Sequence, residues 1–265
     1  MNTPVKAPVL ALLLVGVLAP HGATAQASGA AQASDARARE VMEEVDRRTR
    51  GWGDMEAELL MEIHRGDDVW RRLLDVRLME ADGEDRTLLV LREPADLAGT
   101  AFLSIRAANG ERSQWIYLPS RRRSRRISGT QASDPFLGSD FTYGDLDPPS
   151  LAGYDFRLLR EVDVEGVPGV VIERTDREEP DGPRERLWVD TRDFRLHRVE
   201  YLDGGGALDR TLVLDAYEVV DGFARPGRLE MREEGGDDRT VLVWSDIRIG
   251  VGLTDRDFDP GRMGG

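Results

Sequence analysis

Apolar and polar residues alternate along most of the chain after residue 54. In residues 54–64, for example, Met55, Leu59 and Ile63 share one side of an extended chain, while glutamates occupy the other side. A period of two is typical of a strand that is buried on one face only. Turn residues such as Asn109-Gly110 separate the runs, and almost no long helical pattern lies between them. This arrangement excludes βαβ units and predicts an antiparallel sheet.

We expect about eleven or twelve strands in one large, curved sheet with one apolar and one polar face. The fold class predicted is therefore mainly β (α+β). The runs that carry the prediction are residues 54–64, 69–79, 87–91, 100–106, 113–118, 156–162, 170–175, 186–190, 194–202, 208–219, 228–232 and 239–249.

One amphipathic helix precedes the sheet. It is predicted to begin at Ser34 or Asp35 and to end before Gly51, with Ala38, Val41, Met42 and Val45 at helical spacing. A single helix can cover only part of the apolar face of such a sheet. The rest must be covered by the aromatic-rich central segment, residues 128–153, by a partner protein or by a bound apolar ligand. A short helix is expected near residues 149–153.

The N-terminus has the pattern of a secretory signal peptide. Lys6 precedes an apolar run over residues 9–19, and Ala23-Thr24-Ala25 has the small-x-small form of a cleavage site. We expect cleavage after Ala25, a flexible leader over residues 26–34 and a single domain over residues 35–265. An uncleaved segment that anchors the chain is the alternative.

Composition excludes several classes of function. The chain of 265 residues has no cysteine and, beyond Lys6, no lysine, which excludes thiolate, P-loop and Schiff-base chemistry. Its formal charge of -14 argues against nucleic-acid binding. Asp255, Asp257 and Asp259 have the spacing that opens an EF-hand loop, but a proline follows at the glycine position. The sequence therefore predicts no metal site and no cofactor.

The sequence also predicts no catalytic residues. His64 and His197 lie in strand-like runs, and no G-x-S-x-G motif is present. A hydrolase remains a third alternative, which a serine and a carboxylate beside either histidine would favour.

One basic cluster stands out in this acidic chain: Arg121, Arg122, Arg123, Arg125 and Arg126, five positive charges in six residues. Two interpretations have about equal weight. The arginines contact lipid headgroups, an anionic membrane surface or an acidic partner. Alternatively, they form a charged strand and pair with carboxylates of this protein.

Several runs, in order, resemble the outer membrane lipoprotein-sorting protein family of LolA/LolB-like carriers. The most specific is G-S-D-F-T-Y-x-D-L, residues 138–146. The resemblance covers residues 40–260 and includes residues 115–119, 125–127, 134–146, 187–190, 198–201, 221–222 with Pro226, and 253–255 with Phe258.

This resemblance implies an unclosed half-barrel whose concave face is covered by helices or loops. It further implies a periplasmic carrier that binds acyl chains of lipids or lipoproteins there and carries them toward the outer membrane. The expected partners are an inner-membrane transport complex and, by peripheral contact, the membrane. The alternative is a non-catalytic structural or interaction subunit of an envelope transport complex.

Two groups of residues are assigned to this function. We expect Trp115 and Tyr117 to line the wall of the concave cavity. We expect a mobile cover over the cavity to be formed by Phe136, Leu137, Phe141 and Tyr143. The arginine cluster, Arg121 to Arg126, would contact a headgroup or the membrane near the cavity mouth.

Overall fold

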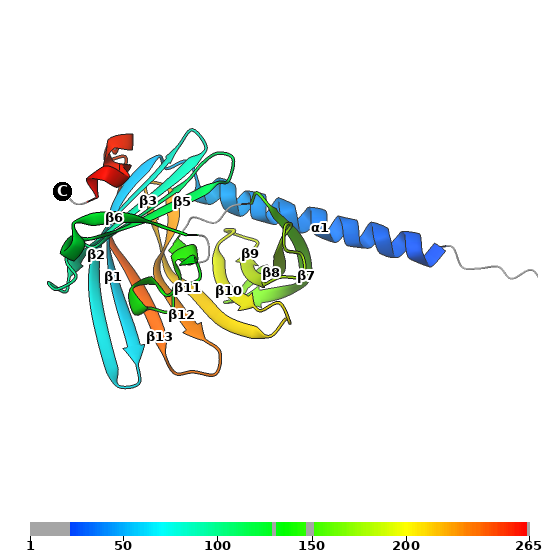
Figure 1. Ribbon diagram of the computed structural model, residues 1–265. Helices are drawn as coiled ribbons and strands as arrows, with labels where there is room; N and C mark the ends of the chain where they lie inside the picture. The colour runs from blue at the N-terminus through cyan, green and yellow to red at the C-terminus, as the bar shows by residue number, and fades with distance from the viewer. Residues whose placement is uncertain (1–21, 129–130, 147–150, 264–265) are drawn as a thin grey trace, which may run out of the picture.

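The protein forms one antiparallel sheet of thirteen strands, which is not closed into a barrel, and a long N-terminal helix (Figure 1). The computed structural model describes residues 22–128, 131–146 and 151–263, with side chains described from residue 32 onward. The single curved sheet, the N-terminal helix and the covering central segment predicted from the sequence are confirmed.

The helix α1 spans Gly22–Thr49. The strands are β1 (Asp54–Arg65), β2 (Asp68–Ala81), β3 (Glu84–Glu93), β4 (Ala101–Arg106), β5 (Arg112–Leu118), β6 (Arg123–Ile127), β7 (Tyr154–Val164), β8 (Val167–Asp176), β9 (Arg184–Asp190), β10 (Leu196–Leu202), β11 (Leu208–Val220), β12 (Phe223–Glu233) and β13 (Arg239–Ile249). Short 3-10 helices are η1 (Pro119–Arg121), η3 (Phe136–Gly138), η4 (Tyr143–Leu146), η5 (Asp255–Phe258) and η6 (Pro260–Arg262).

The sheet consists of two meanders joined along one pair of strands. Strands β1 to β6 follow one another in space, as do β7 to β13, and β1 pairs antiparallel with β13. In that pair Met61 lies opposite Leu242, and both side chains are buried in the main core. The outermost strands, β6 and β7, are therefore consecutive in sequence, and residues 128–153 connect the two edges of the sheet.

Strand β6 is absent from the runs that carry the sheet prediction, although one of the two interpretations of the arginine cluster is a charged strand. Its sequence is Arg-Ser-Arg-Arg-Ile, and only Ile127 is buried. Because apolar and polar residues do not alternate in it, the strand carries no hydrophobic pattern to recognise. Its pairing with β5 places it at the open edge of the sheet.

The helix is longer than expected. Ala38, Val41, Met42 and Val45 are buried in the main core as predicted, but α1 begins at Gly22. Residues 26–34, expected as a flexible leader, are therefore helical. This stretch is rich in alanine, which has the highest helix propensity. Most of the expected signal peptide, residues 1–21, lies outside the described residues, and cleavage after Ala25 would fall within α1.

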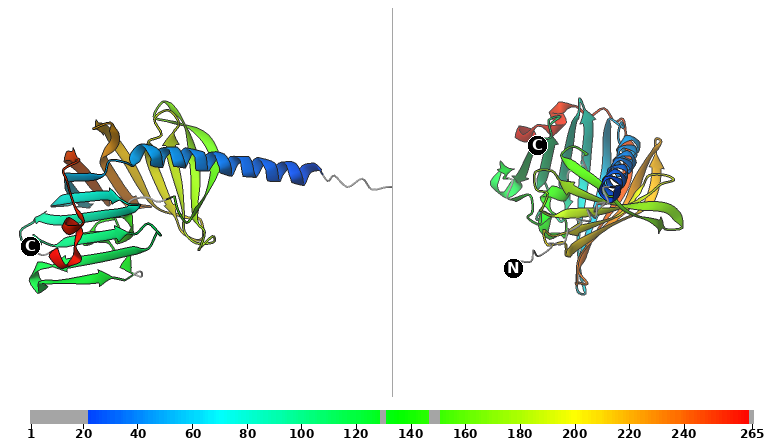
Figure 2. Two further views of the ribbon diagram at one scale, coloured as in Figure 1. Left: turned by 90° about the horizontal axis from the view of Figure 1, so that it is seen from above. Right: turned by 90° about the vertical axis from the view of Figure 1, so that its right-hand side faces the viewer.

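Both faces of the sheet carry apolar cores. The larger core lies on the concave face and includes residues from β1 to β13, from α1 and from the central segment. A smaller core on the convex face joins Met79, Leu88 and Leu103 to Phe258 and Met263 of the C-terminal segment. Figure 2 shows α1 and the C-terminal segment at separate places on the sheet. The concave core is the larger apolar surface and is covered by α1 and the central segment.

Candidate functional site

The central segment between the two sheet edges covers part of the concave face. We call residues 131–146 the cover. Phe136 and Phe141 are 1% and 3% exposed and belong to the concave core, while Leu137 and Tyr143 are partly buried against it. The ring centroids of Phe136 and Tyr143 lie 5.5 Å apart, and that of Phe102 on β4 lies 5.7 Å from Phe136. The four predicted cover residues thus lie together on the concave core.

The cover holds its own shape through local hydrogen bonds. The Phe136 amide donates to the carbonyl of Phe141 at 2.7 Å, and the Ser139 hydroxyl donates to the carbonyl of Phe136, also at 2.7 Å. Leu137 adopts a left-handed backbone conformation with φ 52°. These contacts make a compact turn that presents Phe136 and Phe141 to the sheet.

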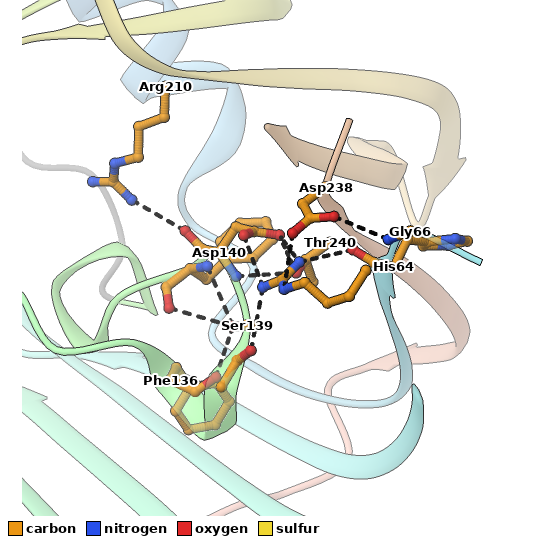
Figure 3. Close-up of polar contacts among 11 residues, drawn as sticks. His64, Gly66, Phe136, Ser139, Asp140, Arg210, Asp238 and Thr240 are labelled. Carbon is orange, nitrogen blue, oxygen red and sulfur yellow. Dashed lines mark hydrogen bonds and ion pairs between the residues drawn. The ribbon is translucent and has the colours of Figure 1, made fainter. Parts of the chain in front are cut away.

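A buried ion pair fixes the middle of the cover to the centre of the sheet (Figure 3). Arg65 at the end of β1 approaches both carboxylate oxygens of Asp140, at 2.9 Å and 3.0 Å. The Thr240 hydroxyl on β13 donates to Asp140 Oδ2 at 2.7 Å and accepts from the Asp140 amide at 3.0 Å. Asp140 and Thr240 are buried. This cluster joins β1, β13 and the cover.

A second ion pair fixes the end of the cover to β11. Arg210 Nη1 and Nη2 donate to the two carboxylate oxygens of Asp145 at 2.5 Å and 3.2 Å. The guanidinium carbon lies 4.3 Å from the ring centroid of Tyr201 on β10. Burial alone would lower the pKa of Arg210, but the hydrogen bond and charge of Asp145 raise it above its usual value. We call Arg65–Asp140 and Arg210–Asp145 the two latch pairs.

Arg210 of the second latch pair is also the end of a row of polar side chains that runs across four neighbouring strands. Arg174, Glu185, Tyr201 and Arg210 are successive cross-strand partners on β8, β9, β10 and β11. Arg174 and Glu185 form an ion pair, and burial raises the pKa of Tyr201 above its usual value. The covered face is therefore apolar with a polar row across β8 to β11, and a second row, Thr87, Ser104 and Gln114, crosses β3 to β5. Apolar walls with a few polar groups are a common composition for a site that binds an amphipathic molecule.

Two surface recesses lie away from the cover. One of about 420 Å³ lies beside the C-terminal end of α1 and is lined by Arg47, Arg48 and Arg195 among others. The other, of about 620 Å³, lies over β1, β2 and β13 and is lined mostly by charged side chains. Neither has the apolar lining that an acyl chain requires.

Trp115 and Tyr117 do not lie where the sequence analysis expected them. Both pack with the convex core, whereas Ile116 between them is buried in the concave core. Alternation along β5 predicts that Trp115 and Tyr117 share a face, but the C-terminal segment makes the convex face apolar as well. The two aromatics are thus part of the convex core and not of the concave wall.

The arginine cluster is exposed at the edge of the sheet. All five arginines are exposed, and within the described ranges none forms an ion pair with a carboxylate. Arg125 donates to Gln131 Oε1 at 3.5 Å, and Arg126 donates to Ser113 Oγ at 2.7 Å and lies 5.9 Å from the Trp115 ring centroid. The interpretation as a charged strand is confirmed for Arg123, Arg125 and Arg126, which lie in β6. The pairing with carboxylates that it included is not found in the described part of the chain.

The histidines have structural contacts. His197 Nε2 lies 2.9 Å from Asp190 Oδ2, and Asp190 also accepts from backbone amides of the turn that follows β9. Burial would raise the pKa of Asp190, but these amides and His197 lower it overall. His64 lies 4.0 Å from Glu62. Among the described contacts, neither histidine ring approaches a serine, as a catalytic triad would require.

The described residues form neither a metal cluster nor a membrane-spanning helix. No group of three or more His, Asp or Glu side chains in the described part of the chain is placed to hold a metal ion. Asp257 and Asp259 instead accept hydrogen bonds from the amides of Thr254 and Gly261. None of the described helices is both long and apolar enough to cross a membrane.

Comparison with known proteins identifies the family. A family model described as that of an uncharacterized protein matches residues 83–264. A solved domain of an outer membrane lipoprotein-sorting protein from Vibrio parahaemolyticus is 31% identical, with a TM-score of 0.82 over 87% of this chain and 99% of that one. The chain belongs to the outer membrane lipoprotein-sorting protein family. The resemblance found in the sequence is therefore confirmed.

Two further solved structures share the family's fold. A DUF1329 family protein from Desulfovibrio piger is 27% identical, with a TM-score of 0.79 over 85% of this chain and 97% of that one. A LolA superfamily protein from Nitrosomonas europaea is 22% identical, with a TM-score of 0.67 over 84% and 97%. No curated protein matches the sequence.

The sequence analysis missed the partners that hold the cover. Asp140 and Asp145 lie in the family motif, but Arg65, Arg210 and Thr240 are far away in the chain and belong to no motif. One signal in the sequence could have indicated them. Asp140 and Asp145 lie between aromatic residues that are expected to be buried, and a buried carboxylate needs a cationic partner. That signal indicates that partners exist, but only the register of β1, β11 and β13 shows which residues they are.

Proposed function

We propose that this protein is a periplasmic carrier that binds acyl chains of lipids or lipoproteins on its concave face for transfer toward the outer membrane. The observation that carries the proposal is the cover. It places Phe136 and Phe141 on the largest apolar surface of the sheet, yet it contributes no strand to that sheet. Displacing it would expose the concave core without breaking any pairing between strands.

The energetics of such an exchange are plausible. Each methylene of an acyl chain contributes about 0.8 kcal/mol when it is buried, so a long chain can replace the contacts of Phe136 and Phe141. Against this stands the cost of separating the two latch pairs, which would leave Asp140 and Asp145 without their cationic partners. The cover would therefore be closed without cargo and displaced when cargo binds.

The proposed function requires no covalent step, no metal and no cofactor. We place the protein in the periplasm, with a signal peptide cleaved after Ala25 and residues 35–265 as one domain. An inner-membrane transport complex and the outer membrane would be its donor and acceptor. N-terminal sequencing of the exported protein tests the cleavage site, since Gln26 should be the first residue.

Native mass spectrometry tests the carrier function directly. The protein is expressed in the periplasm of a bacterial host, purified without detergent and weighed intact, and bound lipids are identified after solvent extraction. A stoichiometric lipid or acylated peptide supports the proposal. A mass equal to that of the bare chain, together with no uptake of added lipid, contradicts it.

A second function is favoured by one specific observation. Phe136 and Phe141 are almost fully buried, so the protein fills this part of its concave face with its own side chains. This suits a non-catalytic interaction subunit of an envelope transport complex, in which the cover never leaves. The variant Phe136→Ala, which removes an aromatic ring of the cover from the concave core, distinguishes the two functions. A carrier should change its lipid uptake, whereas an interaction subunit should lose only stability.

A further inference from the structure

The arginine cluster lies on the outermost strand of an open sheet, and the strand alternation divides it between the two faces. Arg125 is paired with Ile116, and Arg123 with Leu118, both of which pack with the concave core. Arg126 is paired with Trp115, which packs with the convex core. Arg121 and Arg122 lie in the turn before the strand. The guanidinium groups therefore lie on both faces of this sheet edge and in the turn before it.

This edge lies beside the cover. Arg125 donates to Gln131 at the start of the cover, and Gln114 on β5 donates from Nε2 to the carbonyl of Tyr143 at 3.1 Å. Ile127, at the end of β6, belongs to the same concave core as Phe136. A surface that contacts β6 would thus lie next to the segment that covers the concave face.

We propose that the β6 edge docks on the phosphate groups of an anionic lipid bilayer and so presents the cover to the membrane. This inference rests on the proposed carrier function and names the surface on which the carrier works. Charge complementarity supports it, because five arginines in six residues make this edge locally basic and therefore complementary to lipid phosphate. The chain as a whole has a formal charge of -14, so this edge is the part that an anionic surface would attract. Guanidinium groups bind phosphate through paired hydrogen bonds.

The geometry favours a bilayer over an acidic protein strand added to the sheet. Strand β6 has five residues, and it begins only at Arg123, directly after the left-handed backbone conformation of Arg122. Short, charged edge strands discourage pairing with a further strand. A bilayer, unlike an added strand, would contact only the side chains of β6 and not its backbone. These side chains lie on both faces of the sheet edge.

Vesicle binding tests the proposal. The full chain, purified as the host processes it, is sedimented with vesicles of phosphatidylcholine alone or of phosphatidylcholine with phosphatidylglycerol. The test variant replaces Arg123, Arg125 and Arg126 with serine. Since a basic residue near an anionic surface contributes about fivefold in affinity, we expect a loss on the order of 100-fold on the anionic vesicles. Added salt should weaken wild-type binding as well.

A matched control carries the same change of charge elsewhere. Arg71, Arg192 and Arg248 are also exposed but lie beside Glu62, Asp193 and Glu56. Replacing these three with serine should change vesicle binding by less than about threefold. Equal losses in both variants, or equal binding of wild type to both kinds of vesicle, overturn the proposal. Self-association through this edge without vesicle binding also overturns it.

Orientation and function are tested separately. Because the chain has no cysteine, Gln131→Cys can carry an environment-sensitive dye, with Asp181→Cys, between β8 and β9, as the control site. Anionic vesicles should shift the emission at residue 131 only, and a shift at residue 181 alone contradicts the proposed orientation. Lipid uptake from detergent solution is measured on the same proteins. Normal uptake without docking overturns this inference alone, and docking without uptake overturns the carrier function alone.

Discussion

Arginines occupy two opposite environments around the cover. Arg65 and Arg210 are mostly buried and each donates to both oxygens of a carboxylate in the cover. The arginine cluster on and before β6 is exposed, and among the described contacts it pairs with no carboxylate. Buried pairs are costly to break because a charge remains without a partner. Exposed charges contribute little to folding and remain available for binding.

The comparison teaches that position, and not residue type, decides what a basic side chain does in this protein. Apart from the histidines, all basic residues after Lys6 are arginine, so chemical identity cannot separate the two sets. We expect the latch arginines to determine stability and cover opening. We expect the cluster to determine where the protein docks. Each of the following changes should affect one set and leave the other unaffected.

The largest effect is expected from Asp145→Ala. It leaves Arg210 partly buried without its carboxylate, and the free energy of unfolding should fall by about 3 kcal/mol. Chemical denaturation of the purified protein measures the change. The double variant Asp145→Ala with Arg210→Ala should recover part of the loss. A loss below about 0.5 kcal/mol in the single variant would mean that the Arg210–Asp145 pair stabilises the fold no more than an exposed ion pair does.

Thr240→Val should have the next largest effect. The change keeps the shape of the side chain but removes a hydroxyl that both donates to and accepts from Asp140. We expect a loss of about 2 kcal/mol in the free energy of unfolding, because two buried polar groups lose a partner. Hydrogen exchange at the Asp140 amide should also become faster. Unchanged exchange there would show that Arg65 alone holds the middle of the cover.

Alkaline pH should weaken the region beneath the second latch pair. Burial raises the pKa of Tyr201 in the folded state, so its contribution is fully present below the usual tyrosine pKa of about 10 and is lost as pH rises above it. Each pH unit above that value should remove about 1.4 kcal/mol for this group. Denaturation at a series of pH values, with Tyr201→Phe as control, measures the difference. Tyr217 shifts in the same direction and remains in both proteins.

The smallest effect on stability is expected at the cluster. Replacing Arg123, Arg125 and Arg126 with serine should change the free energy of unfolding by less than about 0.5 kcal/mol, because all three side chains are exposed. Thermal unfolding in the absence of lipid is sufficient to measure it. A large loss would mean that the stacking of Arg126 on Trp115 supports the convex core.

The sequence was sufficient for most of the sheet because alternation is a local property. Alternation predicted every strand except β6, which was anticipated only as one interpretation of the arginine cluster. The sequence also placed Phe136, Leu137, Phe141 and Tyr143 in the cover. It could not say which face Trp115 and Tyr117 point to, since apolar residues cover both faces of β5. It could not find the partners of Asp140 and Asp145, because these depend on contacts between distant strands.

One feature of the topology bears on how the cover could move. The two edges of the sheet are neighbours in sequence, and the two meanders meet along β1 and β13. The chain therefore forms a ring that is closed by hydrogen bonds on one side and by a covalent connection on the other. Either link alone would keep the two halves of the molecule together. If the cover leaves the concave face as we propose, or if a protease cuts the covalent connection, the hydrogen-bonded side should preserve the continuity of the sheet.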